Sequence, residues 1–303
     1  MQAQTEIRAQ IIQELERSLS EGRIVWRKPW VGHEGPRLPT NFVTKTRYSG
    51  VNTMLTFAAE ARNNWPISYW ATFNQFRSIG CHIRKGERAT KIIYFTYVKK
   101  FVKDRNGDEV EKSIPIFRVF SIFNISQAQG PAIDQFHAQP VLKTFDDNRS
   151  EFDAVVNATE ARIDHGNELA AYLPLEDRII MPDVGRFDSW PDYAATTFHE
   201  LGHWTQPKHR LNIEWTRPEE ELFAEITSSY LMAAVGIPHG DDLRKNNKAY
   251  IQSWAATIKE SPKALFAAAS KASLATDYIL SFSRGSDASA AESVEEEAAV
   301  ARP

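Results

Sequence analysis

The chain has 303 residues, of which 42% are hydrophobic and 25% are charged, a composition typical of globular proteins and long enough for two domains. No apolar run reaches the ~20 residues that cross a bilayer, and the N-terminus lacks the apolar stretch of a secretory signal, so we expect no membrane partner. The single cysteine, Cys81, excludes an intrachain disulfide and favours the reducing cytoplasm as the location.

The charges are distributed unevenly between the two halves of the chain. Residues 1–130 hold 20 Lys and Arg against 11 Asp and Glu, whereas residues 131–303 hold 16 against 28, and the whole chain has a net charge of −3. A basic half suggests a polyanionic partner for that half. The alternative is a solvated surface that has no partner.

The N-terminal half is predicted to be α+β. Apolar residues at helical spacing indicate a helix over 7–19, and an irregular, proline-containing stretch follows at 26–41. A second helix is expected over 51–63. Two runs rich in β-branched and aromatic residues, 91–102 and 116–123, flank the turn sequence 104–108 and predict a long β-hairpin.

Residues 131–149 are polar and are interrupted by proline, which is typical of a linker. Beyond them we expect a helix at 150–165 and a short strand at 178–181. This strand comes just before the next predicted helix, as the edge strand of a peptidase would. Further helices are predicted at 190–206, 217–236, 241–260 and 262–282, and residues 285–303 should form a disordered tail. The fold class is therefore α+β in two domains: residues 1–130 with the hairpin, and residues 150–284, mostly helical with a short edge strand.

The sequence His199-Glu200-Leu201-Gly202-His203 lies within the helix predicted at 190–206. Residues four apart share one face of a helix, so His199 and His203 can direct two imidazoles at one tetrahedral zinc ion. Glu200 projects beside them, where it could take a proton from the water that the metal activates, as a catalytic base does. Gly202 is expected to keep the helix surface open for the metal or the substrate.

A third metal ligand is expected from the next helix, on which Glu221 and Glu225 are four residues apart with the small Ala224 between them. This arrangement resembles that of gluzincin peptidases, in which the first carboxylate binds the metal and the second orients a ligand histidine. The resemblance implies that Glu221 is the ligand and Glu225 the orienting residue, and the reverse assignment remains open. Zinc is the first choice of metal for this set, with manganese or another divalent ion as the alternative.

The N-terminal half combines aromatic and cationic residues, the two chemistries that hold single-stranded nucleic acid by base stacking and phosphate contact. No recognition-helix motif for duplex DNA is present. Trp26 and Trp30, flanked by charge and proline, are the expected stacking rings. The candidate DNA-binding residues are Trp26, Arg27, Lys28, Trp30, Arg47, Tyr48, Asn52, Arg84, Lys85 and Lys91.

Taken together, the chain resembles ArdC-type antirestriction proteins, some of which are fused to conjugative primases. The matching segments in the first half are 26–30, 48–52, 70–75 and 80–86, and those in the second half are 172–174, 179–182, 198–205 and 220–225. The resemblance implies a single-stranded-DNA-binding domain followed by a zincin-like metallopeptidase domain, which together protect incoming conjugative plasmid DNA from host restriction.

We also expect a protein substrate of unknown identity, for which the host restriction system is a candidate source. Two alternatives from other functional classes remain. The chain could be a non-catalytic single-stranded-DNA-binding protein with a structural metal, or its basic half could dock an acidic protein partner.

Overall fold

The computed structural model describes Gln13 and residues 26–27, 35–103, 109–137, 145–215, 217–238 and 262–283. The helices predicted at 7–19 and 241–260, the turn at 104–108 and the tail at 285–303 lie outside these ranges, apart from Gln13. No helix within the described ranges is long and apolar enough to cross a membrane.

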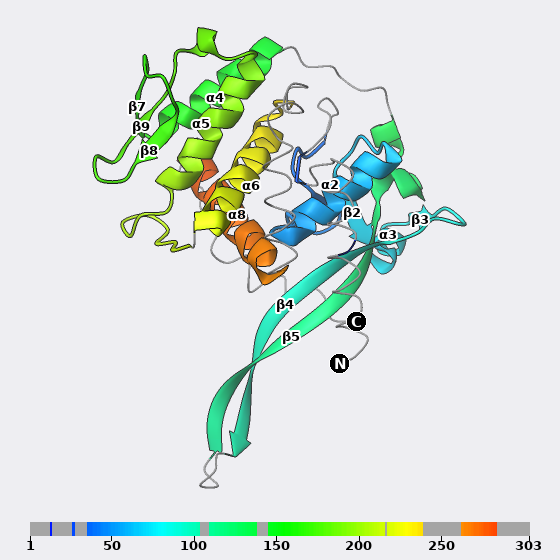
Figure 1. Cartoon of the computed structure of the whole chain (residues 1–303). Helices are drawn as coiled ribbons and strands as arrows, with labels where there is room; N and C mark the ends of the chain where they lie inside the picture. Colours follow the sequence, from blue (N-terminus) through cyan, green and yellow to red (C-terminus); the bar gives the residue numbers. More distant parts are fainter. Residues whose placement is uncertain are drawn as a thin grey trace.

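The N-terminal half is built on a four-stranded sheet of order β1-β2-β5-β4, in which only β1 and β2 run parallel. Its strands are β1 (Thr40–Asn41), β2 (Tyr69–Thr72), β4 (Thr90–Lys103) and β5 (Glu109–Asn124). Helix α2 packs against β4, and a small second sheet of β3 and β6 lies beside α3 (Figure 1). The remaining elements of this half are α2 (Val51–Asn63), α3 (Phe73–Ser78), β3 (His82–Ile83), η1 (Ile125–Gln127), β6 (Ala128–Gln129) and η2 (Asp134–His137).

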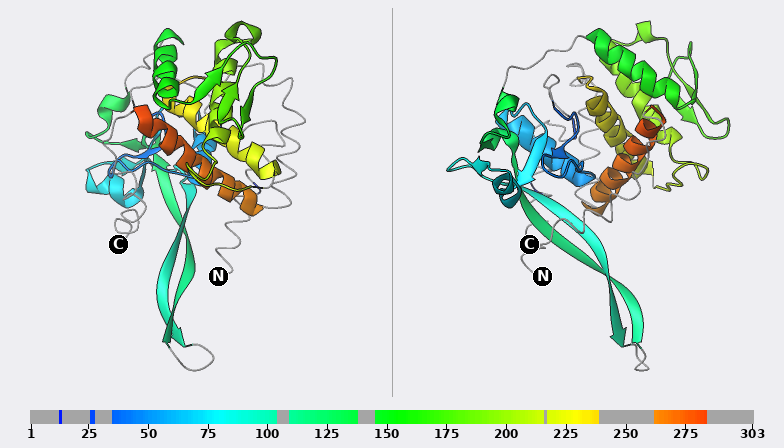
Figure 2. Two further views of the ribbon diagram at one scale, coloured as in Figure 1. Left: turned by 90° about the vertical axis from the view of Figure 1, so that its left-hand side faces the viewer. Right: turned by 180° about the vertical axis from the view of Figure 1, so that it is seen from behind.

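The long hairpin is confirmed, and its strands extend further than the sequence indicates. Strand β5 pairs with β2 only from Ile122 to Asn124, whereas it pairs with β4 over the whole length of β4. Beyond the sheet, β4 and β5 therefore continue as a two-stranded ribbon that leaves the body of the protein (Figures 1 and 2).

Helix α2 spans the residues predicted for it, and local backbone conformation sets both of its ends. It starts after Gly50, which has a φ of 59° and donates its N–H to the Ser273 hydroxyl in the C-terminal half. It ends at Asn64 in the left-handed region, where asparagine is one of the few tolerated side-chain-bearing residues.

The C-terminal half places helices beside a three-stranded sheet of order β7-β9-β8 (Figure 1). Its helices are α4 (Phe145–Ala158), η3 (Val184–Arg186), α5 (Trp190–Trp204), α6 (Arg217–Val235) and α8 (Pro262–Ser283), and its strands are β7 (Arg162–Asp164), β8 (Ala171–Leu173) and β9 (Arg178–Ile180). Helix α6 packs against both α5 and α8.

Three sequence expectations for this region need correction. Residues 150–165 are not one helix, because α4 ends at Ala158 and the chain turns through Glu160, with φ 54°, into β7. The strand predicted at 178–181 is the central strand β9, so the edge strand beside α5 is β8. The first part of the expected linker, residues 131–137, contributes to the N-terminal core, because Ile133 is fully buried there, and residues 138–144 lie outside the described ranges.

One hydrophobic core is shared by the two halves. Trp26, Met54 and Phe57 of the N-terminal half pack in the same buried cluster as Phe223 and Leu265 of the C-terminal half. Polar contacts follow the same boundary: the Tyr230 hydroxyl donates to the Gly50 carbonyl, Arg37 donates to the Val235 carbonyl, and Arg47 pairs with Asp277. Some of the cations of the basic half are therefore bound to groups of the C-terminal half.

Candidate metal centre

Helix α5 presents the two histidines toward α6. It begins at the Ser189 cap, whose hydroxyl accepts the Asp192 N–H, and it buries Ala194, Phe198 and Leu201 in the C-terminal core. His199 and His203, one turn apart, keep 23% and 13% of their side-chain surface exposed. The two imidazoles are thus held by a rigid element and remain partly accessible.

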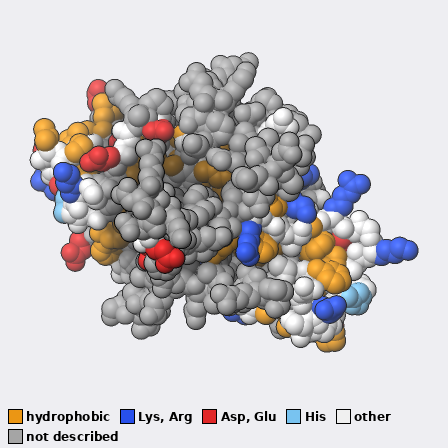
Figure 3. Space-filling view, turned by 90° about the horizontal axis from the view of Figure 1, so that it is seen from below, with side chains coloured by type: hydrophobic (Ala, Val, Ile, Leu, Met, Phe, Trp, Pro, Cys, Tyr) orange, Lys and Arg blue, Asp and Glu red, His pale blue; other side chains and the backbone are white. Residues whose placement is uncertain are grey.

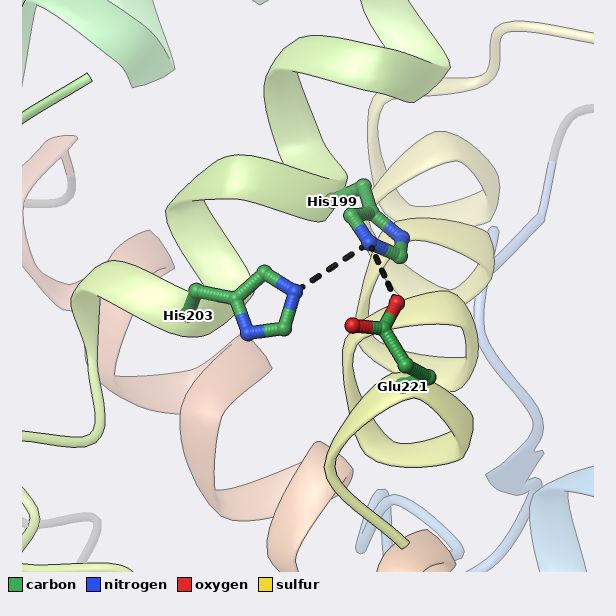
Figure 4. A group of neighbouring side chains, drawn as sticks. All are labelled: His199, His203 and Glu221. Atoms are coloured by element: carbon green, nitrogen blue, oxygen red, sulfur yellow. Dashed lines mark hydrogen bonds and ion pairs between the residues drawn. The ribbon is translucent and has the colours of Figure 1, made fainter. Parts of the chain in front are cut away.

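The two imidazoles and the Glu221 carboxylate converge (Figure 4). Nε2 of His199 lies 3.2 Å from Nε2 of His203 and 3.5 Å from Oε2 of Glu221. One ligand atom from each of the three residues lies within 4.8 Å of the other two. Ligands at zinc–nitrogen distances of ~2.0–2.1 Å stand about 3.3 Å apart in a tetrahedron, so the separations of 3.2 and 3.5 Å from Nε2 of His199 fit a single ion.

Gly202 has a different role from the one expected. A Cβ atom added to it would lie 3.2 Å from Cα of Ala224 and 3.4 Å from Cβ of Thr227, both on α6. Gly202 is buried against that helix and does not open a surface to substrate. The glycine instead allows α5 and α6 to approach closely, which brings Glu221 within reach of His199.

Glu200 is held beside the cluster by strand β8. Its Oε2 accepts the Tyr172 N–H at 2.8 Å, and the residue is 7% exposed. This N–H lies on the edge of β8 that does not pair with β9. The sequence predicted Glu200 as a functional residue but not its backbone partner, because a strand of three residues leaves little periodicity to detect.

The Nδ1 atoms of both histidines face acidic residues of α6. Nδ1 of His199 lies 3.9 Å from Oε2 of Glu225, an ion-pair distance beyond hydrogen-bond range, and Nδ1 of His203 lies 3.3 Å from Oε1 of Glu220 and 3.1 Å from Nε2 of Gln206. A carboxylate that faces Nδ1 favours a ring orientation in which Nε2 faces a metal. Sequence reasoning missed Glu220, although it directly precedes Glu221.

The electrostatics of the cluster differ between its members. Burial lowers the pKa of His199, but its hydrogen bond to Glu221 and the charges of Glu200 and Glu225 outweigh this effect and raise the pKa above the ordinary value. The pKa of His203 is lowered by burial and by neighbouring His199. Burial raises the pKa of Glu200, even though His199 and the Tyr172 N–H oppose the shift.

Comparison with known proteins gives matches in both halves. The family described as the N-terminal domain of anti-restriction factor ArdC matches residues 1–123, and the zincin-like metallopeptidase family matches residues 150–271. The metal-free crystal structure of the antirestriction ArdC protein from the R388 plasmid is 31% identical, with a TM-score of 0.73 over 91% of this chain and 97% of that one. The chain belongs to the ArdC antirestriction family. The manganese(II)-bound structure of the same plasmid protein is 30% identical, with a TM-score of 0.70 over 92% of this chain and 99% of that one.

Relatives of this ArdC-family chain include longer proteins. A DNA primase TraC of Escherichia coli is 32% identical over 302 residues, which cover 90% of this chain but 27% of the primase. The chain thus spans about a quarter of that protein. The uncharacterized protein y4eC of Sinorhizobium fredii is 26% identical, with 92% of each chain covered.

The predicted DNA-binding residues of this ArdC-family chain do not share one exposed surface. Trp26 and Tyr48 are buried, 0% and 7% exposed, so neither ring is available to stack on a base. The Asn52 side chain bonds the backbone of Ile93 in both directions. Lys28 and Trp30 lie outside the described residues.

The predicted cations divide into two groups. Arg27 and Arg47 pair with Glu225 and Asp277 of the C-terminal half. Arg84, Lys85 and Lys91 are exposed on the N-terminal half, although Arg84 pairs with Glu87 and Lys91 donates to the Ser121 hydroxyl within that half. The sequence could not separate the two groups, because the acidic partners of the first are about 200 residues away.

Proposed function

We propose that the chain is an antirestriction protein that binds single-stranded DNA through its N-terminal half and carries a metal-dependent peptidase centre in its C-terminal half. The observation that carries the peptidase proposal is the convergence of His199, His203 and Glu221 with Glu200 beside them. A site with only a structural role would not need a carboxylate held next to the ligands.

We propose a divalent ion at this centre, with zinc as the first choice and manganese as the alternative. Two imidazole nitrogens and one carboxylate suit both ions, and the related plasmid protein has a manganese(II)-bound structure. His199, His203 and Glu221 would hold the ion. When bound, it would supply Lewis-acid activation of water and of the substrate carbonyl.

Glu200 is the proposed general base. Its raised pKa favours proton uptake, and the Tyr172 N–H fixes one of its oxygens, so the other oxygen can receive a proton. The zincin-like metallopeptidase family matches residues 150–271, which supports a polypeptide as the substrate class.

The test replaces Glu200 by Gln and compares plasmid transfer into restricting and non-restricting recipient cells. Glu200→Gln should abolish protection while Mn²⁺ binding, measured by calorimetry, stays at the wild-type level. Glu168→Gln, which changes an exposed carboxylate of the same half, should protect normally. Full protection by Glu200→Gln would overturn the hydrolytic role and favour the structural-metal alternative.

We propose that single-stranded DNA binds around α3, β3 and the start of β4. Figure 3 shows Lys and Arg side chains gathered at the end of the molecule that carries α3 and β3. Phe73, at the start of α3, is 50% exposed and offers a ring for stacking. The exposed cations of this region are Arg77, Arg84, Lys85, Arg88 and Lys91.

Fluorescence anisotropy with a labelled oligonucleotide tests this surface. Affinity should fall steeply with salt, because each neutralised phosphate releases a counterion. Lys85→Glu should weaken binding, whereas Arg186→Glu, the same charge change on the C-terminal half, should leave it unchanged. No binding to the oligonucleotide at low salt would overturn the DNA proposal and favour docking of an acidic protein.

A further inference from the structure

A largely shielded ion pair connects the N-terminal half to the proposed metal centre. The Arg27 guanidinium donates to Oε1 of Glu225 at 2.6 Å, while Oε2 of the same carboxylate lies 3.9 Å from Nδ1 of His199. The Arg27 and Glu225 side chains are only 13% and 16% exposed. Arg27, Glu225 and His199 thus form a series that ends at a proposed metal ligand.

The position of Arg27 is fixed by its neighbour in the sequence. The Trp26 ring is 0% exposed and packs in the core that includes Leu222 and Phe223, which precede Glu225 on α6 by less than one turn. The hydrogen bond between Arg27 and Glu225 is charge-assisted and largely shielded from water, and such bonds are strong and directional. The pair therefore holds the Glu225 carboxylate in one orientation.

We propose that Arg27 is a positioning residue of the metal centre, which fixes the carboxylate that orients His199 and so makes metal affinity depend on the N-terminal half. The inference rests on the metal site proposed above. Arg27 occupies one oxygen of Glu225 and leaves the other toward Nδ1. This geometry supports Glu221 as the ligand and Glu225 as the orienting residue, the assignment that the sequence left open.

The loss of Arg27 would have two physical consequences. The Glu225 carboxylate would keep its charge in a largely shielded site without its partner, an unfavourable state that is relieved when the side chain moves. Such a movement takes the carboxylate away from Nδ1 of His199. Outer contacts of this kind typically change metal affinity by about 10- to 100-fold when they are removed.

The experiment measures the Mn²⁺ dissociation constant of the full chain by calorimetry and records the visible spectrum of the Co²⁺-loaded protein, which reports coordination geometry. Arg27→Met should weaken Mn²⁺ binding by about 10-fold and change the Co²⁺ spectrum, and Arg27→Lys should give an intermediate loss. The matched control is Arg37→Met. Arg37 also joins the halves, through Glu151 and the carbonyl of Val235 at the far end of α6 from Glu221, and its removal should leave both readouts unchanged.

A double variant separates positioning from general loss of stability. If Arg27 acts through Glu225, Arg27→Met should add little to the loss caused by Glu225→Gln. Wild-type affinity in Arg27→Met, or fully additive losses in the double variant, would overturn the inference. If circular dichroism shows that Arg27→Met does not fold, the Mn²⁺ affinity of Arg27→Lys is the test. Wild-type affinity of Arg27→Lys overturns the inference, and weakened binding supports it.

The same measurements distinguish this inference from the proposed function. If the wild-type chain binds no Mn²⁺, or if His199→Ala binds it equally well, the proposed metal centre is overturned. The proposed role of Arg27 is then overturned as well. If the wild-type chain binds Mn²⁺ at His199 and Arg27→Met binds it equally tightly, only the role of Arg27 is overturned.

Discussion

Substitution of Gly202 by alanine tests whether close contact between α5 and α6 assembles the metal centre. The new Cβ would lie 3.2 Å from Cα of Ala224, 3.4 Å from Cβ of Thr227 and 3.5 Å from Cβ of Ala224. Carbon atoms prefer separations of about 3.5–4.0 Å. The two helices must therefore move apart by a few tenths of an ångström.

This movement should affect metal binding more than folding. Overpacking costs about 1–3 kcal/mol, and replacing a helical glycine by alanine returns about 1 kcal/mol, so the net loss of stability should be about 1 kcal/mol. Metal–ligand distances tolerate only about 0.2 Å. Glu221 would move with α6 away from His199, and we expect affinity to fall at least about 10-fold, equivalent to about 1.4 kcal/mol.

Urea denaturation would measure the stability and calorimetry with Mn²⁺ the affinity. The control is Gly185→Ala, because a Cβ at that position meets nothing within 4 Å. A folded Gly202→Ala protein that binds Mn²⁺ as tightly as the wild type would refute the reasoning, since the ligands would then tolerate separation of the helices.

Three further outcomes are expected. Glu60→Ala leaves the buried Ser68 hydroxyl and Trp70 indole N–H without their acceptor and should lower the free energy of unfolding by about 3 kcal/mol. A loss below about 1 kcal/mol in urea denaturation would count against this role of Glu60. Phe223→Ala in the shared core should cost about 3–5 kcal/mol, and an unchanged urea midpoint would argue against that packing. Mn²⁺ at 100 times its dissociation constant should stabilise the wild-type chain by about 2.7 kcal/mol, and a thermal scan of His203→Ala should show no such gain.

Local patterns predicted the elements that have strong local signals. Helix α2, helix α5 and the β4–β5 hairpin follow from apolar spacing, β-branched runs and turn residues. The spacing of His199 and His203 was sufficient to place both rings on one face. These predictions succeeded because each depends on residues close together in the sequence.

The remaining features depend on contacts between distant segments. Strands β7 and β8 have three residues each and no period to detect. Trp26 resembles a stacking ring in its charged local sequence, yet residues near 223 and 265 bury it. The sequence around Gly202 likewise gives no sign of a packing role, because its close neighbours, Ala224 and Thr227, are on α6.

The core common to both halves also bears on how this region is inherited. Neither half can be cut away without exposing large apolar side chains of the other, such as Trp26 or Phe223. Fusion to a longer protein should therefore keep both halves together. The match to TraC fits this expectation, because 90% of the chain aligns with 27% of the longer primase.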